Sequence, residues 1–356
     1  MNILHLINHA GSGGSEKYIE MLTESFSGGE ICFAYNEDGP LREKMVAKGV
    51  NSVKIGMRSP FDIGAARQVA KLCKQHKIGI IHTHFLREAY VAVLSKLFNR
   101  GVKVVYTYHI LERLGFGQKA ANWLFMRFCD AVIAVCKVGR ASLIENKIPP
   151  KKIAVIYNGA PKVEKCDTDF RGEFGIAADD FVFVTVTRLS PEKGVDFLLR
   201  SVEKLAADMP YKLVVVGDGP LLEQMQQYAS QNNLRNVIFT GKRADVGAIL
   251  QQSNCFINSS QTEALSFAIV EALSHKLPVV ATKVGGNVEI VNEETNCGIA
   301  VDYGDEDALA RAMQKMMQDE NFRETCSDNA LKLVAETFNA EKMLKETFNI
   351  YEKISN

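Results

Sequence analysis

Two carboxylates are separated by seven residues in the segment Glu263-Ala-Leu-Ser-Phe-Ala-Ile-Val-Glu271. The sequence predicts a helix that begins near Ser266 as its N-cap, so Glu263 lies in the preceding loop and Glu271 in the second turn. Both carboxylates could then approach one ligand. Such a pair suits two kinds of chemistry: holding the hydroxyls of a diol on ribose or a hexose, or general acid and base catalysis as in a glycoside hydrolase.

Two cations distinguish between these alternatives. Arg188 and Lys193 stand in the loop Thr187-Arg-Leu-Ser-Pro-Glu-Lys-Gly194, after a predicted strand over Phe181–Thr187. A guanidinium fork and a point cation at the carboxyl end of a strand suit the two charges of a diphosphate, although a surface ion pair is the alternative. A hydrolase of neutral sugars needs no such clamp, so the carboxylates are better assigned to hydroxyls.

Two further loops follow the next strands. Val216-Gly-Asp-Gly-Pro220 is a tight turn with either a structural or a ligand role, and Thr240-Gly-Lys242-Arg243 could border a nucleobase through backbone groups. In the first half, the glycines of Asn8-His-Ala-Gly11-Ser-Gly13-Gly14-Ser-Glu16 lie between a strand and a helix, where backbone N–H groups can approach an anion. Their spacing matches neither G-x-G-x-x-G nor G-x-x-x-x-G-K-[ST].

Histidines follow two strands of the first half. His82 and His84 end one predicted strand and His109 follows another, at the sheet edge where α/β proteins bind ligands. Of these, His109 is the better candidate. None has the helical spacing of a metal site, so we expect no metal.

Short β-branched runs alternate with amphipathic segments throughout, which predicts two parallel sheets covered by helices. The strands expected in the first half are 3–7, 31–35, 53–55, 78–83, 103–108, 131–135 and 153–156, with a helix over 17–25. Those of the second half are 181–187, 212–216, 236–239, 255–257, 278–281 and 298–301, with helices over 195–207, 221–232, 246–251 and 267–274 and a helical segment from 305 to the end. The turn Asn158-Gly-Ala-Pro161 marks the domain break, so we expect domains of residues 1–160 with 340–356 and of 161–339.

Composition and charge limit the function. At 356 residues with 47% hydrophobic residues, the chain can bury two cores. Residues 1–165 hold 24 Lys and Arg against 13 Asp and Glu, an excess of 11 positive charges, and the remainder holds 18 against 29. The eight cysteines are scattered, and the sequence shows neither a signal peptide nor 18 consecutive apolar residues. We therefore expect a reduced, cytoplasmic protein that does not span a membrane.

The positive excess suggests an anionic partner for the first half. Arg67, Lys71, Lys74 and Lys77 share one predicted helix, and the segment Phe116–Phe128 contains the one Trp of the chain, Trp123. These features fit either an anionic membrane surface on the inner face of the membrane or, separately, a solvated helix face and a core helix. Nucleic acid is not an expected partner.

Taken together, the chain resembles the retaining glycosyltransferases of family 4, which have the GT-B fold: two Rossmann-like domains facing across a cleft. The matching motifs are T-R-L-S-P-E-K-G at 187–194, V-G-D-G-P at 216–220, the E-x7-E pair, P-V-V-A-T-K-V-G-G-N-V-E at 278–289, G-G-S-E at 13–16 and the Asn158-Gly159 hinge. The segment Phe338–Tyr351 resembles the final helix of the family, which crosses back to the first domain. The sequence departs from the family at Ala264-Leu265-Ser266, where glycine more commonly follows the first Glu.

The resemblance implies a role for each candidate residue. Arg188 and Lys193 hold the donor diphosphate and stabilise the leaving nucleotide without a metal. Glu263 binds the hydroxyls of the transferred sugar, and Glu271 those of the ribose. His109 is implied to lie beside the donor sugar, and it forms the expected catalytic set with Arg188, Lys193 and Glu263. Further donor contacts are implied for Gly13, Gly14, Lys242, Arg243, Leu265, Ser266 and Phe267.

The expected activity is hexosyl transfer from a nucleotide-sugar, with UDP-sugars favoured, to a saccharide or lipid-linked acceptor in cell-surface polysaccharide or glycolipid synthesis. No cofactor is expected. A nucleotide-sugar epimerase, a catalytically silent nucleotide-binding subunit and a nicotinamide oxidoreductase are the alternatives, the last weakened by the missing glycine fingerprint.

Overall fold

The computed structural model describes residues 1–161, 163, 168–205 and 209–356. The chain divides into two compact units, one made of Met1–Asn158 with Glu341–Asn356 and the other of Gly159–Ala340. Each unit has its own parallel sheet and its own hydrophobic core. The expected α/β class with two Rossmann-like units is confirmed.

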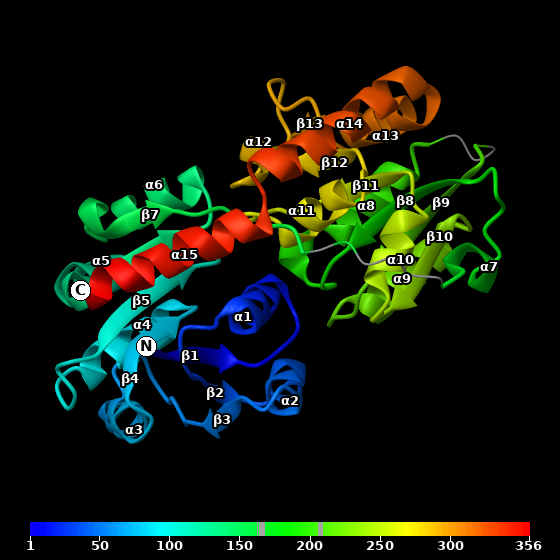
Figure 1. Ribbon diagram of the computed structural model, residues 1–356. Helices are drawn as coiled ribbons and strands as arrows, with labels where there is room; N and C mark the ends of the chain where they lie inside the picture. The colour runs from blue at the N-terminus through cyan, green and yellow to red at the C-terminus, as the bar shows by residue number, and fades with distance from the viewer. Residues whose placement is uncertain (162, 164–167, 206–208) are drawn as a thin grey trace. The chain divides into compact units, whose positions relative to one another are not determined.

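Seven parallel strands form the sheet of the first unit, in the order β3-β2-β1-β4-β5-β6-β7 (Figure 1). The strand order reverses between β1 and β4, and this switch point is where doubly wound sheets bind ligands. The strands are β1 (Asn2–His9), β2 (Ile31–Glu37), β3 (Asn51–Lys54), β4 (Ile78–Thr83), β5 (Lys103–Tyr108), β6 (Ala131–Ala134) and β7 (Ile153–Val155). The helices are α1 (Gly14–Ser25), α2 (Pro40–Ala47), α3 (Ile63–Gln75), α4 (Leu86–Ser95), α5 (Phe116–Phe125), η1 (Met126–Phe128), α6 (Lys137–Glu145) and η2 (Pro150–Lys152).

Six parallel strands form the sheet of the second unit, in the order β10-β9-β8-β11-β12-β13, with its switch point between β8 and β11. The strands are β8 (Phe181–Val186), β9 (Tyr211–Val216), β10 (Val237–Gly241), β11 (Cys255–Asn258), β12 (Val279–Thr282) and β13 (Gly298–Val301). The helices are α7 (Phe170–Glu173), η3 (Pro191–Lys193), α8 (Val195–Val202), α9 (Leu222–Gln231), α10 (Val246–Gln251), α11 (Phe267–Ser274), α12 (Asn287–Ile290), α13 (Glu306–Gln318) and α14 (Glu320–Glu336).

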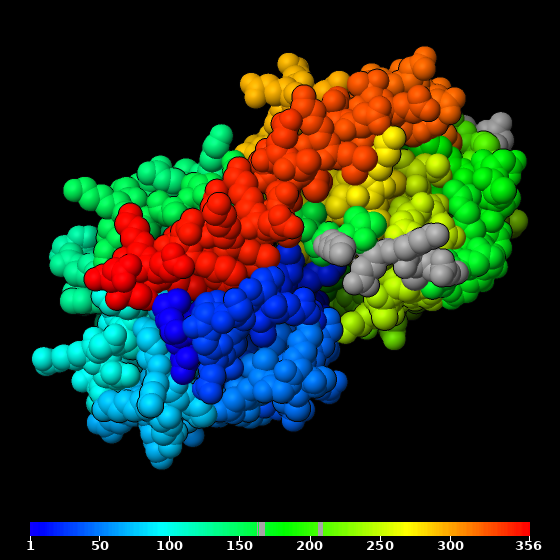
Figure 2. Space-filling view, in the orientation of Figure 1, coloured from blue at the N-terminus to red at the C-terminus, as the bar shows by residue number. Residues whose placement is uncertain are grey.

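The last helix, α15 (Ala340–Ser355), packs on the sheet of the first unit. Its buried Met343 and Tyr351 join Ile3 and Ile133 in one apolar cluster. Ser355 Oγ lies 3.0 Å from the Met1 sulfur, and Figure 2 shows the last residues (red) beside the first ones (dark blue). The chain therefore returns to its N-terminal unit, as expected.

Two sequence predictions about helices need correction or restriction. Lys77 does not share a helix with Arg67, because α3 ends at Gln75 and Lys77 has a left-handed φ of 51°. Since β4 begins at Ile78, only two residues are available to reverse the chain, and this tight reversal needs a positive φ. The helix expected over residues 195–207 spans 195–202, and its expected residues 206 and 207 lie outside the described residues.

Candidate functional site

The loop after β8 carries both predicted cations. Pro191 starts the short helix η3, and Gly194 ends it with a left-handed φ of 61° before α8 begins. A Cβ atom on Gly194 would lie 2.2 Å from the carbonyl oxygen of Ser259, in the segment that follows β11. Glycine here therefore lets the loops after β8 and β11 meet at the switch point of the sheet.

This close approach joins Lys193 to Glu263. Lys193 Nζ lies 2.7 Å from Glu263 Oε1, and the hydroxyl of Ser260 donates to the same oxygen at 2.8 Å. The two charged side chains are only 25% and 12% exposed. Lys193, predicted to bind phosphate, and Glu263, predicted to bind hydroxyls, thus form a partly buried ion pair. The sequence did not predict this pairing.

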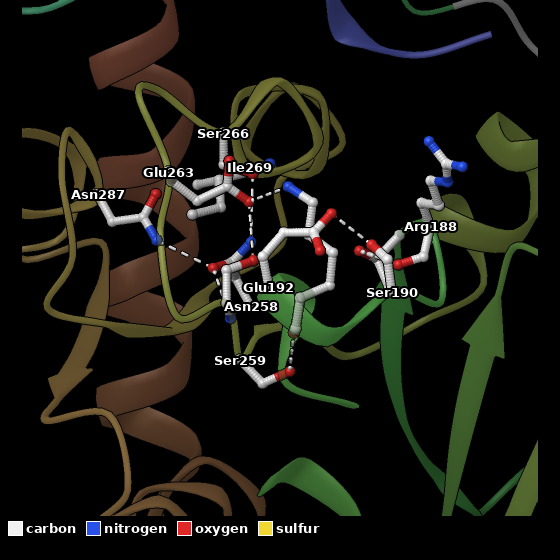
Figure 3. Close-up of polar contacts among 12 residues, drawn as sticks. Arg188, Ser190, Glu192, Asn258, Ser259, Glu263, Ser266, Ile269 and Asn287 are labelled. Atoms are coloured by element: carbon white, nitrogen blue, oxygen red, sulfur yellow. Dashed lines mark hydrogen bonds and ion pairs between the residues drawn. The ribbon is translucent and has the colours of Figure 1, made fainter. Parts of the chain in front are cut away.

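Arg188 lies apart from this pair. Its side chain is exposed, and its guanidinium makes no hydrogen bond to any residue that the structure describes. Figure 3 shows it extending away from the cluster around Glu263, Ser266 and Asn258. The five N–H donors of this guanidinium are thus available to an anionic ligand.

The turn after β9 supports the backbone that carries Arg188. Gly217 has a φ of 138°, and a Cβ atom on it would lie 1.8 Å from the carbonyl oxygen of Thr187. A Cβ on Gly219 would lie 2.4 Å from the carbonyl oxygen of Leu189. Leu189 N–H in turn donates to the carbonyl of Asp218 at 3.0 Å. Only glycine permits these close approaches, so a structural role of the turn accounts for Gly217 and Gly219.

Helix α11 begins as predicted, with Ser266 as its N-cap accepting from the N–H of Ile269. The side chains expected near the donor are buried there: Leu265 is 5% exposed, Phe267 7% and Glu271 9%. Glu271 lies in the second turn of the helix. The first turn of the helix therefore presents backbone N–H groups, and the second turn carries a carboxylate.

Sequence reasoning missed an amide network beside Ser266. Asn258 donates to the Ser266 hydroxyl at 3.3 Å, and Asn287 donates to Asn258 Oδ1 at 2.9 Å (Figure 3). The Oδ1 atom of Asn287 is buried without a hydrogen-bond partner among the described residues. The polar run Asn258-Ser-Ser260 at the carboxyl end of β11 was the available signal, because strand ends at that edge bind ligands.

The segment after β10 has a mixed role. Arg243 donates to both oxygens of Glu173 at 2.6 and 2.8 Å and to both oxygens of Asp245 at 2.9 and 2.8 Å. This side chain ties α7 to the start of α10. Lys242 is exposed, so its side chain and the backbone of this segment are the groups left to border a ligand.

In the first unit, Gly13 is the N-cap of α1 and Gly14 its first residue. The carboxylate of Glu16 lies over this turn: a Cβ on Gly11 would lie 3.1 Å, and one on Gly13 3.0 Å, from an oxygen of Glu16. Ser15 Oγ donates to Glu16 at 2.7 Å. The glycines therefore make room for an acidic side chain, and an anion at this turn requires Glu16 to move.

His109 follows β5 and is hydrogen-bonded to a second histidine, with Nε2 3.3 Å from His84 Nδ1. Burial lowers the pKa of His109 to about 3, so its ring is neutral near pH 7. The structure thus gives His109 a partner that the spacing of the sequence did not reveal.

Among the described residues, one group meets the distance requirement for a metal: His5, His82 and His84, with ligand atoms within 4.8 Å of one another. Both nitrogens of His82 are already hydrogen-bonded, to Tyr351 at 2.5 Å and Thr107 at 2.7 Å. The rings of His82 and His84 stack with centroids 4.5 Å apart and an interplanar angle of 29°. This geometry is poorly suited to a shared ion.

The second unit thus holds an exposed guanidinium, a lysine–glutamate pair and a buried carboxylate near the switch point of a parallel sheet. Such groups suit a ligand that has both phosphates and hydroxyls, as a nucleotide-sugar has.

The comparisons with known proteins identify the class. A family model described as "Glycosyltransferase Family 4" matches residues 12–162, and one described as "Glycosyl transferases group 1" matches residues 167–333. Together they cover most of both units. The chain therefore belongs to the glycosyltransferases of group 1 and family 4 type, as the sequence motifs indicated.

Individual relatives agree with this assignment. The chain is 24% identical to N-acetyl-alpha-D-glucosaminyl L-malate synthase of Bacillus anthracis over 85% of this chain and 82% of the relative. It is 25% identical to UDP-Gal:alpha-D-GlcNAc-diphosphoundecaprenol alpha-1,3-galactosyltransferase of Escherichia coli over 82% and 79%. The crystal structure of Anabaena HepE in complex with UDP and glucose superposes with a TM-score of 0.88 at 21% identity, covering 99% of this chain and 100% of that one. This likeness shows the shared GT-B fold.

Proposed function

We propose that this glycosyltransferase transfers a hexose-type sugar from a UDP-sugar, with retention of the anomeric configuration, to a lipid-linked or saccharide acceptor in cell-surface polysaccharide or glycolipid synthesis. The observation that carries the proposal is the arrangement in the loops after β8 and β11: Lys193 is paired with Glu263, and the exposed Arg188 side chain bonds no residue that the structure describes.

Each group has a distinct part in donor binding. Lys193 has three N–H donors, so it can keep Glu263 and still contact a phosphate oxygen. Arg188 offers a bidentate fork to the diphosphate. Glu263 accepts from hydroxyls of the transferred sugar and Glu271 from those of the ribose, with the N–H groups of the Leu265–Phe267 segment assisting.

The choice of UDP is supported by the relatives. The Escherichia coli relative is named for UDP-Gal, and HepE has been crystallised with UDP and glucose. On this chain, the exposed Lys242 and the backbone of its segment border the base, because the Arg243 side chain is engaged with Glu173 and Asp245.

Retention follows in this proposal from a front-face displacement. Glu263 is already paired with Lys193 and Ser260, which suits a hydroxyl-holding group better than a nucleophile. As the glycosidic bond to the diphosphate breaks, Arg188 and Lys193 stabilise the negative charge on the leaving UDP. The leaving phosphate oxygen takes the proton of the acceptor hydroxyl, which then bonds to the anomeric carbon on the same face. These two cations supply the charge that a divalent metal would otherwise provide.

An anionic membrane surface is the proposed location of the acceptor. On α5 and η1, Phe116 is 91% exposed, Trp123 59% and Phe128 55%, and the Arg127 guanidinium lies 4.2 Å from the Trp123 ring centroid. A core role for this segment as a whole is therefore wrong, although Met126 is buried. Exposed aromatic rings beside a cation are typical of membrane-surface contacts.

The basic face of α3 adds to this surface chemistry. Arg67, Lys71 and Lys74 line a hollow of about 280 Å³ with Phe98, whose ring lies 5.1 Å from the Arg67 guanidinium. No helix among the described residues is both long and apolar enough to cross a bilayer. The proposed association is peripheral and electrostatic, so it weakens with salt.

Donor binding is tested first by thermal-shift measurements with UDP, GDP and ADP, and then with their sugars. A ligand at 100 times its dissociation constant raises stability by about 2.7 kcal/mol. Stabilisation by UDP and UDP-glucose, followed by transfer to a diphosphate-linked lipid acceptor with an α-linked product by NMR, supports the proposal. Inversion of the linkage would contradict retention. An altered sugar formed from donor alone identifies an epimerase, and UDP binding without transfer or hydrolysis identifies a silent subunit.

Membrane association is tested by sedimentation with liposomes that contain or lack anionic lipid. The double variant Trp123→Ser/Phe128→Ser should lose sedimentation with anionic liposomes, whereas Leu331→Ser, which removes an exposed apolar side chain in the second unit, should not. No binding of the unmodified protein at low salt rejects the membrane proposal and leaves donor binding untouched.

A further inference from the structure

Four histidines gather on one face of the sheet of the first unit. His5 in β1 is the register partner of His82 in β4. His84 follows β4 directly, and its ring centroid lies 4.5 Å from that of His82; His109 follows β5 directly, and its ring centroid lies 5.5 Å from that of His84. His5, His82 and His84 are at most 1% exposed.

Three of these side chains form a continuous chain of contacts, here called the histidine wire: His5, His84 and His109. His5 Nδ1 lies 3.2 Å from His84 Nε2, and His84 Nδ1 lies 3.3 Å from His109 Nε2. The ring of Tyr18 from α1 covers the wire, with its centroid 6.0 Å from that of His84 and 5.1 Å from that of His109. The wire therefore leads from a buried strand to the carboxyl edge of the sheet.

All three rings of the wire are neutral near pH 7. Burial lowers the pKa of His5 and of His109 to about 3, and burial together with the neighbouring histidines lowers the pKa of His84 well below its usual value. Within the described residues, no carboxylate is hydrogen-bonded to the wire. A buried imidazole without a carboxylate partner has nothing to stabilise its charged form.

Neutrality constrains the proton positions. A neutral imidazole has one N–H donor and one bare acceptor nitrogen. If His84 donates from Nδ1, then His109 is bare at Nε2 and carries its proton at Nδ1; if His84 donates from Nε2, then His109 donates from Nε2 and is bare at Nδ1. In both arrangements Nε2 of His109 contacts His84, the tautomer of His109 follows from that of His84, and Nδ1 of His109 remains for another partner.

We propose that His84, itself held by His5, is a positioning residue that fixes the ring orientation and the single neutral tautomer of His109. This inference deepens the proposed function and rests on it, together with the donor contact that the family resemblance implies for His109. A neutral nitrogen with a fixed proton suits recognition of an uncharged sugar hydroxyl, whereas an imidazolium would favour a phosphate. In either arrangement Nδ1 of His109 can bond a sugar hydroxyl, which both donates and accepts.

The direct test is ¹⁵N NMR of histidine-labelled, deuterated protein, which contains seven histidines. The wire predicts for His109 one pyrrole-like and one pyridine-like nitrogen shift that persist from about pH 7 to about pH 5, below the usual histidine pKa of about 6.5. In His84→Phe the two shifts should move towards the average of a tautomer mixture, and His84→Gln, which restores a donor and an acceptor, should recover part of the separation. His5→Phe supplies a second variant from the far end of the wire.

A matched control removes a hydrogen bond beside the wire and leaves the wire intact. Tyr351→Phe deletes the hydroxyl bound to His82 Nδ1, so the His109 shifts should not change. The proposal is overturned if the two His109 shifts are averaged in the unmodified protein. It is also overturned if the His109 shifts are unchanged in both His84→Phe and His5→Phe. Shifts that change on treatment with EDTA reveal a bound metal and overturn it as well.

A double-mutant cycle separates positioning from simple destabilisation. With UDP-glucose as donor, His84→Phe should lower turnover by about tenfold or more, within the range for hydrogen bonds that orient a reacting group. In a His109→Ala background the same change should have no further effect, because His84 acts through His109. Additive losses would contradict the wire. Absence of any turnover in the unmodified protein would reject the proposed function, while the NMR result would still decide the wire.

Discussion

Replacing Lys193 should lower both stability and turnover, whereas replacing Arg188 should lower turnover alone. The reason is that Lys193 is in an ion pair, while the Arg188 side chain bonds no residue that the structure describes. Lys193→Met removes the partner of a carboxylate that is only 12% exposed. Arg188→Met removes an exposed side chain that bonds no described residue. Both changes remove a proposed contact to the diphosphate.

The stability loss can be bounded from the geometry of the pair. At 2.7 Å and an effective dielectric constant of about 20, the attraction between Lys193 and Glu263 is about 6 kcal/mol before desolvation and side-chain ordering are subtracted. Exposed pairs retain about 0–1 kcal/mol and fully buried ones lose about 3–5 kcal/mol when broken, so this partly buried pair should lose about 1–3 kcal/mol. For a unit of this size, the melting temperature should fall by about 3–10 °C.

The assay combines differential scanning calorimetry with turnover of UDP-glucose. Turnover should fall by about 10²–10³ in both variants, the scale for losing one preorganised electrostatic contact. Only Lys193→Met should lower the melting temperature, and Glu263→Gln in that background should restore part of it. The control is Lys204→Met, which breaks an exposed pair with Asp307 of similar length, 2.9 Å. Wild-type turnover in Arg188→Met, or equal melting temperatures for Lys193→Met and Lys204→Met, would refute the reasoning.

Three further outcomes follow from particular contacts. Gly217→Ala should lower the free energy of unfolding of the second unit by about 2 kcal/mol or more, because its Cβ would lie 1.8 Å from the carbonyl oxygen of Thr187. Gly241 also has a positive φ, but a Cβ there would meet nothing within 4 Å. In urea unfolding, Gly241→Ala should therefore lose only about 1 kcal/mol. Arg243→Met removes hydrogen bonds to Glu173 and Asp245, so it should lower the free energy of unfolding by about 1–3 kcal/mol. The dissociation constant of UDP should change by less than about twofold. A large loss of UDP affinity in calorimetry would show that this side chain binds the donor. Acid should destabilise the first unit, because burial lowers the pKa of His5 to about 3 while the side chain in the unfolded chain titrates near 6.5. Between these two pH values the unfolded chain binds more protons than the folded one. The free energy of unfolding therefore falls as the pH drops from about 6.5 towards 3, by up to about 1.4 kcal/mol per pH unit for this group. Urea unfolding at about pH 7, 6 and 5 should show a smaller slope in His5→Phe, and identical slopes would contradict this.

The sequence predicted the elements well where a local signal was strong. Buried parallel strands are short β-branched runs, and β4, β5 and β13 have the predicted bounds. Helix α11 begins after Ser266 as predicted, because a serine N-cap before an apolar run is a local signal. These elements placed Arg188 and Lys193 after a strand, and Glu263 in the loop before a helix, before any tertiary contact was known.

Contacts between distant segments were not predictable in the same way. Lys193 and Glu263 are 70 positions apart, and their pairing depends on how closely two loops approach through Gly194. His5 gave no signal of its own, because its role arises from the register of β1 with β4. Exposure was also ambiguous: the aromatic composition around Trp123 fits a core helix or a surface, and only packing distinguishes the two.

Calorimetric titration of UDP into the unmodified protein and into Arg188→Met tests whether the loops at the β8/β11 switch point bind the diphosphate of a nucleotide-sugar. The variant removes a free guanidinium and should leave the fold unchanged. Since charge-assisted hydrogen bonds contribute about 1.5–3 kcal/mol, the account predicts UDP affinity weakened by about ten- to a hundredfold in the variant. Equal UDP affinity in the two proteins, with the unmodified protein binding UDP, would contradict the claim.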